Sequence, residues 1–375
     1  MPIQRAKVNI SNLSNTTLSG TTTITGTLKT PSVVTTENLY SFSGTAYFDT
    51  AVNNGYYQPA AYDCYIKRYA DIGSATFPPS GSSASSHGLN AASVNASTWC
   101  ANRQLFDVIN GCQLWRVPVT GTYTLTAKGA GRAASYDGYG RSVTCDFALR
   151  AGEWLRIICG AQGESNGSNF SGGHGASCIS VFRQGKHIPI LIGAGGAGLS
   201  GNSNQSNQAA KRDAKPPQSS YGQGATQGHS SGHFSGREGM GGHGSFYGHG
   251  YDSYIEHWPG GGGGGWGSPG NGGNIGKNIH ESNAAGRALS EHCPHGGYYE
   301  SGDAYHGGFG GGGATGISSG GSGGGGGYIG GNAGYTVSSS AADDTNIMGG
   351  ISYCAATSFT DNGTHSTYGQ VQVSL

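Results

Sequence analysis

Charge is scarce in this chain of 375 residues. Only 11% of the residues are charged, and 20 Lys and Arg balance 20 Asp and Glu. The nearest approach to a basic cluster is Lys211, Arg212 and Lys215 in a polar stretch. Proteins that bind nucleic acid need a positively charged surface to contact phosphates. We therefore expect no nucleic-acid partner.

Long apolar runs are also missing. The sequence contains no stretch of about twenty consecutive apolar residues, which predicts that the chain has no membrane span. The first residues, Met1–Leu13, are polar and lack the apolar centre of a secretory signal. We expect from this that the protein does not follow the ordinary secretory route.

Catalytic motifs in their full sequence context are absent as well. H-E-x-x-H does not occur, and the stretches that match G-x-S-x-G, such as GESNG and GHSSG, lie in glycine- and serine-rich sequence that does not predict the helix expected after a catalytic serine. The spacing Gly193-x-Gly195-x-x-Gly198 follows an apolar strand, but the polar residues after it do not predict the helix that would bind a pyrophosphate. The carboxylates Glu291, Glu300 and Asp303 lie in glycine-rich loops without supporting structure. The chain is predicted to be no enzyme and to need no cofactor.

Histidine offers the only candidate metal ligands. His229 and His233 are separated by three residues, and His292, Cys293 and His295 form a second group. Neither group has a clear set of carboxylate or thiol partners, and such spacing is common by chance. We predict polar loop residues here and no metal site.

The eight cysteines show no C-x-x-C spacing, which excludes the common zinc and redox motifs. Their wide separation suits long-range disulfides, which would stabilise a fold with little apolar core. Buried thiols are the alternative, because assembly inside a cell takes place in a reducing medium. The pairing cannot be derived. The cysteines are Cys64, Cys100, Cys112, Cys145, Cys159, Cys178, Cys293 and Cys354.

What the chain has in excess is glycine, at 73 residues. Unbroken runs such as Gly260–Gly265 and Gly323–Gly327 are separated by single aromatic residues, among them Trp266 and Tyr328. Flexible linkers are usually diluted with serine and lack aromatics, whereas threefold extended helices of glycine can pack closely and satisfy each other's backbone groups. We predict an ordered polyglycine scaffold, with a disordered coil as the alternative. The glycines assigned to this scaffold are Gly262, Gly263, Gly312 and Gly325.

The N-terminal part divides into two regions. Residues 1–36 carry apolar residues such as Ile10, Leu18 and Ile24 among Thr, Ser and Gly, which indicates extended β structure with too few apolar groups for its own core. The segment resembles the shaft or attachment segments of viral and phage fibre proteins, and this likeness implies a homotrimer anchored to fibre-base or other virion proteins. A frayed polar leader is the alternative. Residues 37–105 are interpreted as a β-rich connecting region.

Alternating patterns predict antiparallel strands from about residue 113 onward. The stretch QLWRVPVTGTYTLTAKGAG alternates, and FALRAGEWLRIICGAQG continues with a turn at Ala151-Gly152. A further pair surrounds Gln184-Gly185, and the terminal GQVQVSL places Val371 and Val373 on one face. We predict a domain over 106–375, with sandwich strands in 106–200 and 365–375 and a polyglycine bundle with loops in 201–364.

These motifs also carry a family resemblance. The order of WRVPVTGTYTLTAKGAG, FALRAGEWLRIICGAQGE, ISVFRQGKHIPILIGAGGAG, the glycine runs and the closing GQVQVSL resembles the glycine-rich extracellular region of anaplastic lymphoma kinase and leukocyte tyrosine kinase over Phe106–Leu375. The resemblance implies a mainly β fold in which a TNF-like jelly-roll β-sandwich is combined with a bundle of polyglycine II helices. The receptors' signal, kinase and membrane span have no counterpart here, and their ligand-binding residues are not transferred.

Glycine-helix bundles also occur in phage tail-tip adhesins, whose loops recognise the host, and the likeness to them is architectural. It favours a virion-surface fibre or spike whose glycine-rich head binds a host glycan or protein. Exposed aromatic and polar side chains suit such contacts. Trp258, Trp266 and Phe309 have an equally strong reading as rings packed on the bundle. The candidate contact residues are Tyr221, His229, His233, Phe234, Phe246, Tyr247, Tyr251, Tyr254, His295, Tyr298, Tyr299 and Tyr305.

Two other functions stay open. An extracellular, secreted or receptor-derived ligand-binding module would account for the long resemblance from Phe106 onward. A purely structural protein that decorates a capsid would share the features of a fibre without binding a receptor.

Overall fold

The computed structural model divides the chain into two units, Met1–Cys64 and Tyr65–Leu375, and all the residues that it describes belong to the second unit. The predicted fibre-like segment therefore lies outside the described residues. The described residues are 74–77, 106–109, 112–117, 120–132, 136–165, 170–183, 186–199, 212–217, 239–242, 260–272, 274–275, 279–280, 284–291, 294–298, 305–315, 321–334 and 347–374.

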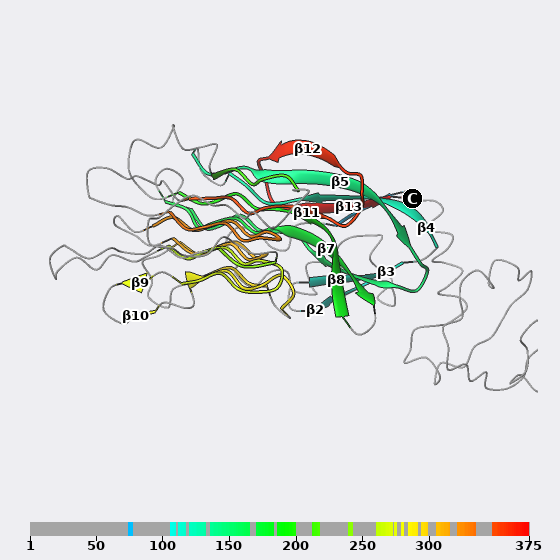
Figure 1. Ribbon diagram of the computed structural model, residues 1–375, viewed down its shortest axis with the longest axis horizontal. Helices are drawn as coiled ribbons and strands as arrows, with labels where there is room; N and C mark the ends of the chain where they lie inside the picture. Colours follow the sequence, from blue (N-terminus) through cyan, green and yellow to red (C-terminus); the bar gives the residue numbers. More distant parts are fainter. Residues whose placement is uncertain are drawn as a thin grey trace, which may run out of the picture. The chain divides into compact units, whose positions relative to one another are not determined.

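The described part of the chain is mainly β, as predicted, and helical residues are almost absent from it. None of its helices could span a membrane. The strands, labelled in Figure 1, are β1 (Ser74–Phe77), β2 (Phe106–Ile109), β3 (Cys112–Arg116), β4 (Gly121–Lys128), β5 (Gly140–Leu149), β6 (Trp154–Ile158), β7 (Ser177–Arg183), β8 (Lys186–Gly193), β9 (Asn274–Ile275), β10 (Ile279–His280), β11 (Tyr353–Cys354), β12 (Thr360–His365) and β13 (Gln370–Ser374).

One antiparallel sheet has five strands in the order β1-β13-β4-β5-β12. Successive side chains along its strands β4 and β13 alternate between the core and the solvent, as the sequence pattern predicted. In β4, Tyr123, Leu125 and Ala127 are buried, and in β13 Val371 and Val373 are buried, because successive side chains of a strand point to opposite faces. The C-terminal strand pairs with β4 along its whole length.

The second antiparallel sheet has six strands in the order β11-β8-β7-β6-β3-β2. The connection from β5 to β6 turns at Ala151 and Gly152, as expected, and Gly152 adopts a positive φ of 84° that favours glycine. The β7–β8 hairpin also forms, with Arg183 opposite Lys186. A register shift follows Ile179 in this hairpin.

The main core fills the space between the two sheets. It is built of buried residues from β4, β5 and β13 on one side and from β3, β6, β7 and β8 on the other. The rings of Trp115 and Tyr123 meet edge to face, with centroids 6.2 Å apart and planes at 80°. This arrangement is favourable for aromatic pairs and joins β3 to β4 across the core. The fold is therefore sandwich-like.

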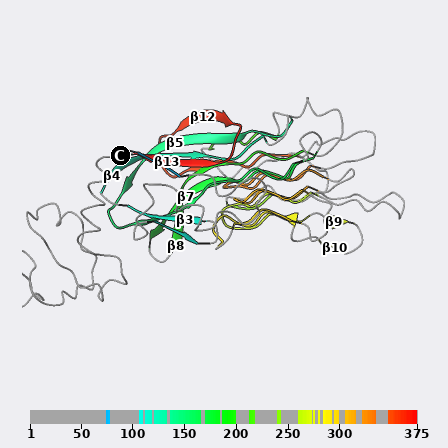
Figure 2. The same cartoon turned by 180° about the vertical axis from the view of Figure 1, so that it is seen from behind.

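Six of the sandwich strands continue directly into glycine-rich chains. Strands β4, β6 and β8 are followed by 129–132, 159–165 and 194–199, while β5, β7 and β11 are preceded by 136–139, 170–176 and 347–352. Figure 1 shows these extended chains running side by side away from the strand arrows, and Figure 2 shows the same continuity from behind. We call these segments, together with 212–217, 239–242, 260–272, 284–291, 294–298, 305–315 and 321–334, the glycine bundle.

Three strands of these two sheets lie outside the ranges in which the sequence predicted sandwich strands. They are β1, β11 and β12. Strand β12 forms an edge of the five-stranded sheet, and a register shift between Asp361 and Gly363, with Gly363 at a φ of 88°, interrupts its pairing with β5. Asp361 forms an ion pair with Arg141. A bulge and charges on an edge strand discourage pairing with a foreign strand.

Candidate functional site

Backbone hydrogen bonds within the glycine bundle repeat every third residue. In the chain 171–176, residues three apart donate to the same neighbouring chain, so that three neighbours surround it. Ser171 and His174 donate to the first neighbour, at Leu199 and Gly196 respectively. Gly172 and Gly175 donate to the second, at Glu164 and Ala161. Gly173 and Ala176 donate to the third, at Gly313 and Gly310. In a β-sheet, by contrast, the partners alternate between two neighbours in one plane.

The same period holds in the longest glycine run. Gly261 and Gly264 donate to one chain, at Ala314 and Gly311, while the two residues between them donate to other chains. Gly262 donates to Asn271 and Gly263 donates to Gly331, at N–O distances of 2.9 Å in both cases. Each of these four buried amides thus finds a partner in a neighbouring chain, as buried amides require.

Close contact between backbones leaves no room for a side chain at many positions of this interior. A Cβ atom on Gly263, Gly312 or Gly325 would lie less than 3.0 Å from a carbonyl oxygen of a neighbouring chain, at Gly325, Gly173 and Gly195 respectively. The fourth predicted scaffold glycine, Gly262, is also buried and accepts a bond of 3.0 Å from the Gly286 amide. Glycine is needed here because it has no Cβ.

At the end nearest the sandwich, the aromatic residues between the glycine runs pack on the outer face of the six-stranded sheet. Phe309, fully buried, and Tyr328 form a second apolar cluster with Ile158 and Ile192 of that sheet, and Trp266 packs against it. The reading of Trp266 and Phe309 as packed rings is therefore the one that the structure supports. Trp258 lies outside the described residues.

Arg156 of β6 strengthens this junction. Its side chain is buried, and Nη1 donates a hydrogen bond of 2.7 Å to the carbonyl of Leu289, while Nη2 donates to the carbonyl of Glu291. A guanidinium in a fixed orientation is well suited to hold two neighbouring carbonyl oxygens. The arginine thus attaches the turn 288–291 of the bundle to the sheet.

A polar cluster lies inside the bundle. Asp137, Ser171 and His174 are fully or almost fully buried, and the Ser171 hydroxyl donates to Asp137 Oδ1. His174 Nδ1 accepts a bond of 3.0 Å from the Gly163 amide, so a neutral ring carries its proton on Nε2, which faces Asp137 Oδ2 at 3.4 Å. The serine hydroxyl bonds to the carboxylate and not to the histidine, and the cluster is closed to solvent. His174 Nε2 makes no hydrogen bond within the described residues. We interpret the cluster as a structural network, because its members are closed to solvent and are joined to one another and to the backbone.

Other ionisable groups enter the bundle at its edge. Asp213 accepts a hydrogen bond of 2.9 Å from the Tyr139 amide, and burial raises the pKa of its carboxyl while the charge of Lys215 opposes the rise. Burial likewise lowers the pKa of the Lys215 ammonium. Desolvation disfavours the charged form of both groups.

The far end of the bundle carries a group of half-buried polar and aromatic side chains. Ser171 forms an isolated antiparallel β-bridge with Leu199, and Tyr305 forms another with Thr315. The Thr315 hydroxyl donates a hydrogen bond to the Ser171 carbonyl. These residues lie where chains that leave the sandwich at β6 and β8 reach their described ends. The far end thus brings together segments that are distant in sequence.

On this end, the rings of Phe170 and Tyr305 are stacked, with centroids 5.9 Å apart and planes at 7°. The adjacent His306 places Nε2 at 3.9 Å from Glu164 Oε2, and both side chains are about one-third exposed, at 34% and 39%. Tyr298 lies on a neighbouring chain, in which Gly297 accepts a hydrogen bond from the Gly307 amide. We call Glu164, Phe170, Tyr298, Tyr305 and His306 the tip cluster.

The structure describes three of the predicted contact residues. Tyr305 and Tyr298 belong to the tip cluster, and His295 contacts Tyr298 with ring centroids 5.7 Å apart. Glu164, Phe170 and His306 were not among the predicted contact residues. Their signal was an aromatic or charged side chain beside a glycine segment, as in NFSGG and YHGGFG. The predicted residues that lie outside the described part are Tyr221, His229, His233, Phe234, Phe246, Tyr247, Tyr251, Tyr254 and Tyr299.

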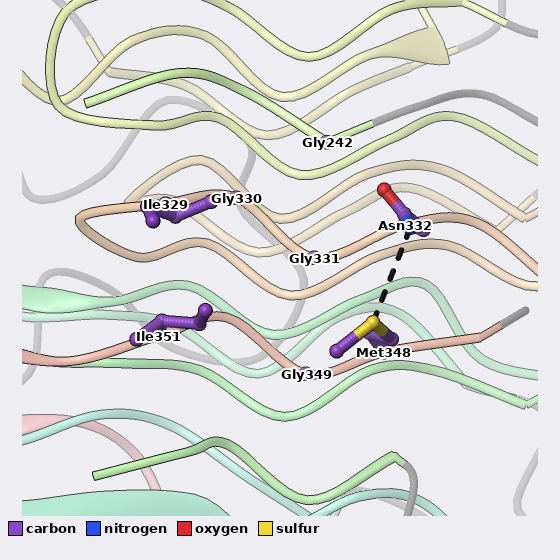
Figure 3. Close-up of a pocket in the computed structure, with 8 residues that line it drawn as sticks. All are labelled: Gly242, Ile329, Gly330, Gly331, Asn332, Met348, Gly349 and Ile351. Atoms are coloured by element: carbon purple, nitrogen blue, oxygen red, sulfur yellow. Dashed lines mark hydrogen bonds between the residues drawn. The ribbon is translucent and has the colours of Figure 1, made fainter. Parts of the chain in front are cut away.

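Figure 3 shows a small hollow between glycine chains. It is lined by residues of 329–332 and 348–351 together with Gly242, and the Asn332 amide points across it to the sulfur of Met348 at 4.0 Å. Its volume is about 10 Å³, which is near the minimum for one water molecule. The hollow is too small for a sugar ring.

Within the described ranges, no group of three His, Cys, Asp or Glu side chains is placed to hold a metal ion. Cys145, Cys178 and Cys354 are thiols, while Cys64, Cys100 and Cys293 lie outside the described residues. No family model matches this sequence.

Proposed function

We propose that the glycine bundle consists of polyglycine II helices and that the sandwich is a TNF-like jelly roll. The threefold repeat of the hydrogen bonds supports the first part, because a threefold extended helix turns its amide groups toward three neighbours in succession. The antiparallel pairing of the two sheets around one core supports the second. Together they form a rigid support for the tip cluster.

We further propose that the protein is a virion fibre or spike, anchored by its N-terminal segment as a homotrimer, whose glycine-rich head attaches to the host surface. The observation that carries this proposal is the tip cluster, in which stacked rings and a His–Glu pair are held at the end of a closely bonded bundle. Rigid display lowers the entropy lost on binding. The location that follows is the virion surface.

A host glycan fits the tip cluster best. Aromatic faces bind the apolar faces of sugar rings, while carboxylate and imidazole groups can accept or donate hydrogen bonds to hydroxyls. The tip cluster offers both kinds of group from Phe170, Tyr305, His306 and Glu164. Partners at the base would be other virion proteins.

A ligand-binding module of the anaplastic lymphoma kinase type is the second candidate function. The observation that favours it is the direct continuation of sandwich strands such as β6 and β8 into glycine chains, which is the pairing that the sequence resemblance implies. Such a module would be extracellular, and its ligand would be a protein. A capsid-decorating protein without receptor binding would share the same architecture.

Replacing Tyr305 with alanine is expected to reduce binding to a glycan by more than tenfold, because a stacked ring at the centre of a contact surface is typical of a binding hot spot. The measurement is the apparent Kd of the full-length chain for the best ligand on an array of immobilised oligosaccharides. Phe359→Ala is the matched control, since Phe359 is 42% exposed and lies between β11 and β12 on the sandwich. Equal losses in both variants, or none in Tyr305→Ala, would contradict a role for the tip cluster. Failure of the unaltered chain to bind either the array or intact host cells would contradict host attachment.

Removal of residues 1–36 is expected to convert a trimer into a monomer, because the predicted fibre-like segment has too few apolar groups to form a core alone and would bury them between copies. Light scattering coupled to size exclusion measures the mass of both forms. A monomer from the full-length chain would argue against the fibre and in favour of the ligand-binding module.

A further inference from the structure

Two thiols from opposite sheets meet in the sandwich core. Cys145 of β5 is 4% exposed and stands opposite Leu125 in the five-stranded sheet. Cys354 of β11 stands opposite Leu191 in the six-stranded sheet and packs against the same core from a half-buried position. Leu125 and Leu191 both belong to that core. Both sulfur atoms are therefore in the layer that separates the sheets.

The two thiols lie close enough to change each other's ionisation. Interaction with the Cys145 side chain lowers the pKa of Cys354; burial opposes the effect, and the Ala356 backbone adds to it. The same interaction, together with burial, raises the pKa of Cys145. Of the pair, Cys354 has the greater thiolate character and the easier access to solvent, so it is the better nucleophile.

Cys159 and Cys178 differ from Cys354 both in exposure and in the direction of the pKa shift. Cys159 and Cys178 are fully buried, at 0% exposure, and burial raises the pKa of both thiols, in Cys178 to about 12. Cys112 is 2% exposed and belongs to the second apolar cluster. Buried thiols with raised pKa values react slowly. Among the described cysteines, reactivity should therefore be concentrated at Cys354.

We propose that Cys145 and Cys354 form a redox-controlled cross-link site, at which a low-molecular-weight disulfide such as oxidised glutathione closes an intramolecular disulfide between the two sheets. In the first step, the Cys354 thiolate attacks one sulfur of oxidised glutathione, forms a mixed disulfide and releases one glutathione thiolate. In the second, Cys145 loses its proton and attacks the Cys354 sulfur, which releases the second glutathione thiolate. The protein loses two electrons and two protons, and oxidised glutathione becomes two molecules of glutathione.

The cross-link would form only after the chain moves from a reducing compartment to an oxidising one. A chain that folds in a reducing cytosol keeps both thiols, and the same chain exposed to an oxidising medium closes the link. Because the disulfide would join residues far apart in the sequence, it would restrict the unfolded chain strongly. The link would also fix β11, a strand of two residues at the edge of its sheet, to β5 of the other sheet.

The experiment compares the full-length chain after incubation with reduced or oxidised glutathione. We expect a peptide that contains Cys145 joined to Cys354 in a non-reducing digest, with a mass two hydrogens below that of the separate peptides. We also expect the oxidised chain to melt at least about 4 °C above the reduced chain. Cys354→Ser and, separately, Cys145→Ala should abolish the linked peptide and the shift in Tm.

Each variant is compared with its own reduced form, so a variant that is less stable still gives a result. Iodoacetamide labelling of the reduced chain supplies an independent measurement, because Cys354 should be alkylated faster than Cys178. A linked peptide that joins Cys354 to any other cysteine would overturn the proposal. So would the absence of a linked peptide from the unaltered chain, or a Tm shift that persists in Cys354→Ser.

Discussion

The Gly325→Ala variant is expected to lose about 3 kcal/mol or more of unfolding free energy, although it adds a single methyl group. The added Cβ would lie under 3.0 Å from the carbonyl oxygen of Gly195. The obstacle is backbone, which cannot move to another rotamer, and the chain that carries Gly195 is itself bonded to Gly326 and Gly350. Thermal and denaturant unfolding of the purified chain measure the loss.

Gly267→Ala is the matched control for this prediction. Gly267 is exposed, and a Cβ there would meet its nearest neighbour, the Gly239 oxygen, at 3.5 Å, which is ordinary van der Waals contact. Its stability should stay within about 0.5 kcal/mol of the unaltered chain or rise slightly, because alanine restricts the unfolded chain more than glycine does. Equal stability of both variants would favour the disordered coil over the ordered bundle.

The Phe309→Ala variant is expected to lose about 3–5 kcal/mol of unfolding free energy. Phe309 is fully buried in the cluster between the outer face of the six-stranded sheet and the bundle. Its carbonyl accepts the Ala161 amide at 2.9 Å, so the ring and its backbone hold the same junction. Removal of the ring leaves a cavity that the glycine chains cannot fill, because they have no side chains to rearrange. Denaturant unfolding gives the free energy.

Phe182→Ala serves as the comparison for this second variant. Phe182 is 49% exposed and touches only the ring of His187 among its described ring contacts, at a centroid distance of 5.2 Å. Its loss should cost less than about 1 kcal/mol. Amide exchange would also locate the effect, because Phe309→Ala should speed exchange in the glycine runs on either side of Trp266 and Tyr328. A Phe309→Ala chain as stable as Phe182→Ala would contradict the junction described above.

Strands with a regular pattern were predictable from the sequence, and those without one were not. Leu125, Val371 and Val373 alternate with polar residues, and the structure places them in the core. Strand β12 has the sequence TDNGTH and lies at an edge with mostly exposed residues, so no apolar period marks it. Its place depends on pairing with β5, which is a tertiary contact that local propensity does not encode.

The need for glycine was predictable, but the partners of each glycine were not. Gly263, Gly312 and Gly325 all have backbone where a Cβ would be, as the unbroken runs indicated. A run of identical residues without side chains contains no register information, so nothing in the sequence shows that Gly261 bonds to Ala314. Register is instead supported by the residues between the runs, such as Phe309, which packs against Ile158 and Ile192 of the sheet.

The tip cluster shows the same limit. Tyr298 and Tyr305 were predicted as contact residues because aromatic side chains in glycine-rich loops suit contacts with a ligand. Phe170 comes from a segment more than one hundred residues earlier, and its stacking on Tyr305 follows from the path of the chains through the bundle. Sequence reasoning can nominate residue types for a contact surface, but the fold decides which of them meet.

The continuation of β4, β6 and β8 into the glycine bundle has a mechanical consequence. A force applied at Glu164 or Phe170 of the tip cluster would pass along covalent backbone into β6 or β7 of the six-stranded sheet. Hydrogen bonds in three directions around each chain would resist shear, since no row of bonds can open one at a time from a free edge. Such a head would stay attached under load until its core strands themselves give way.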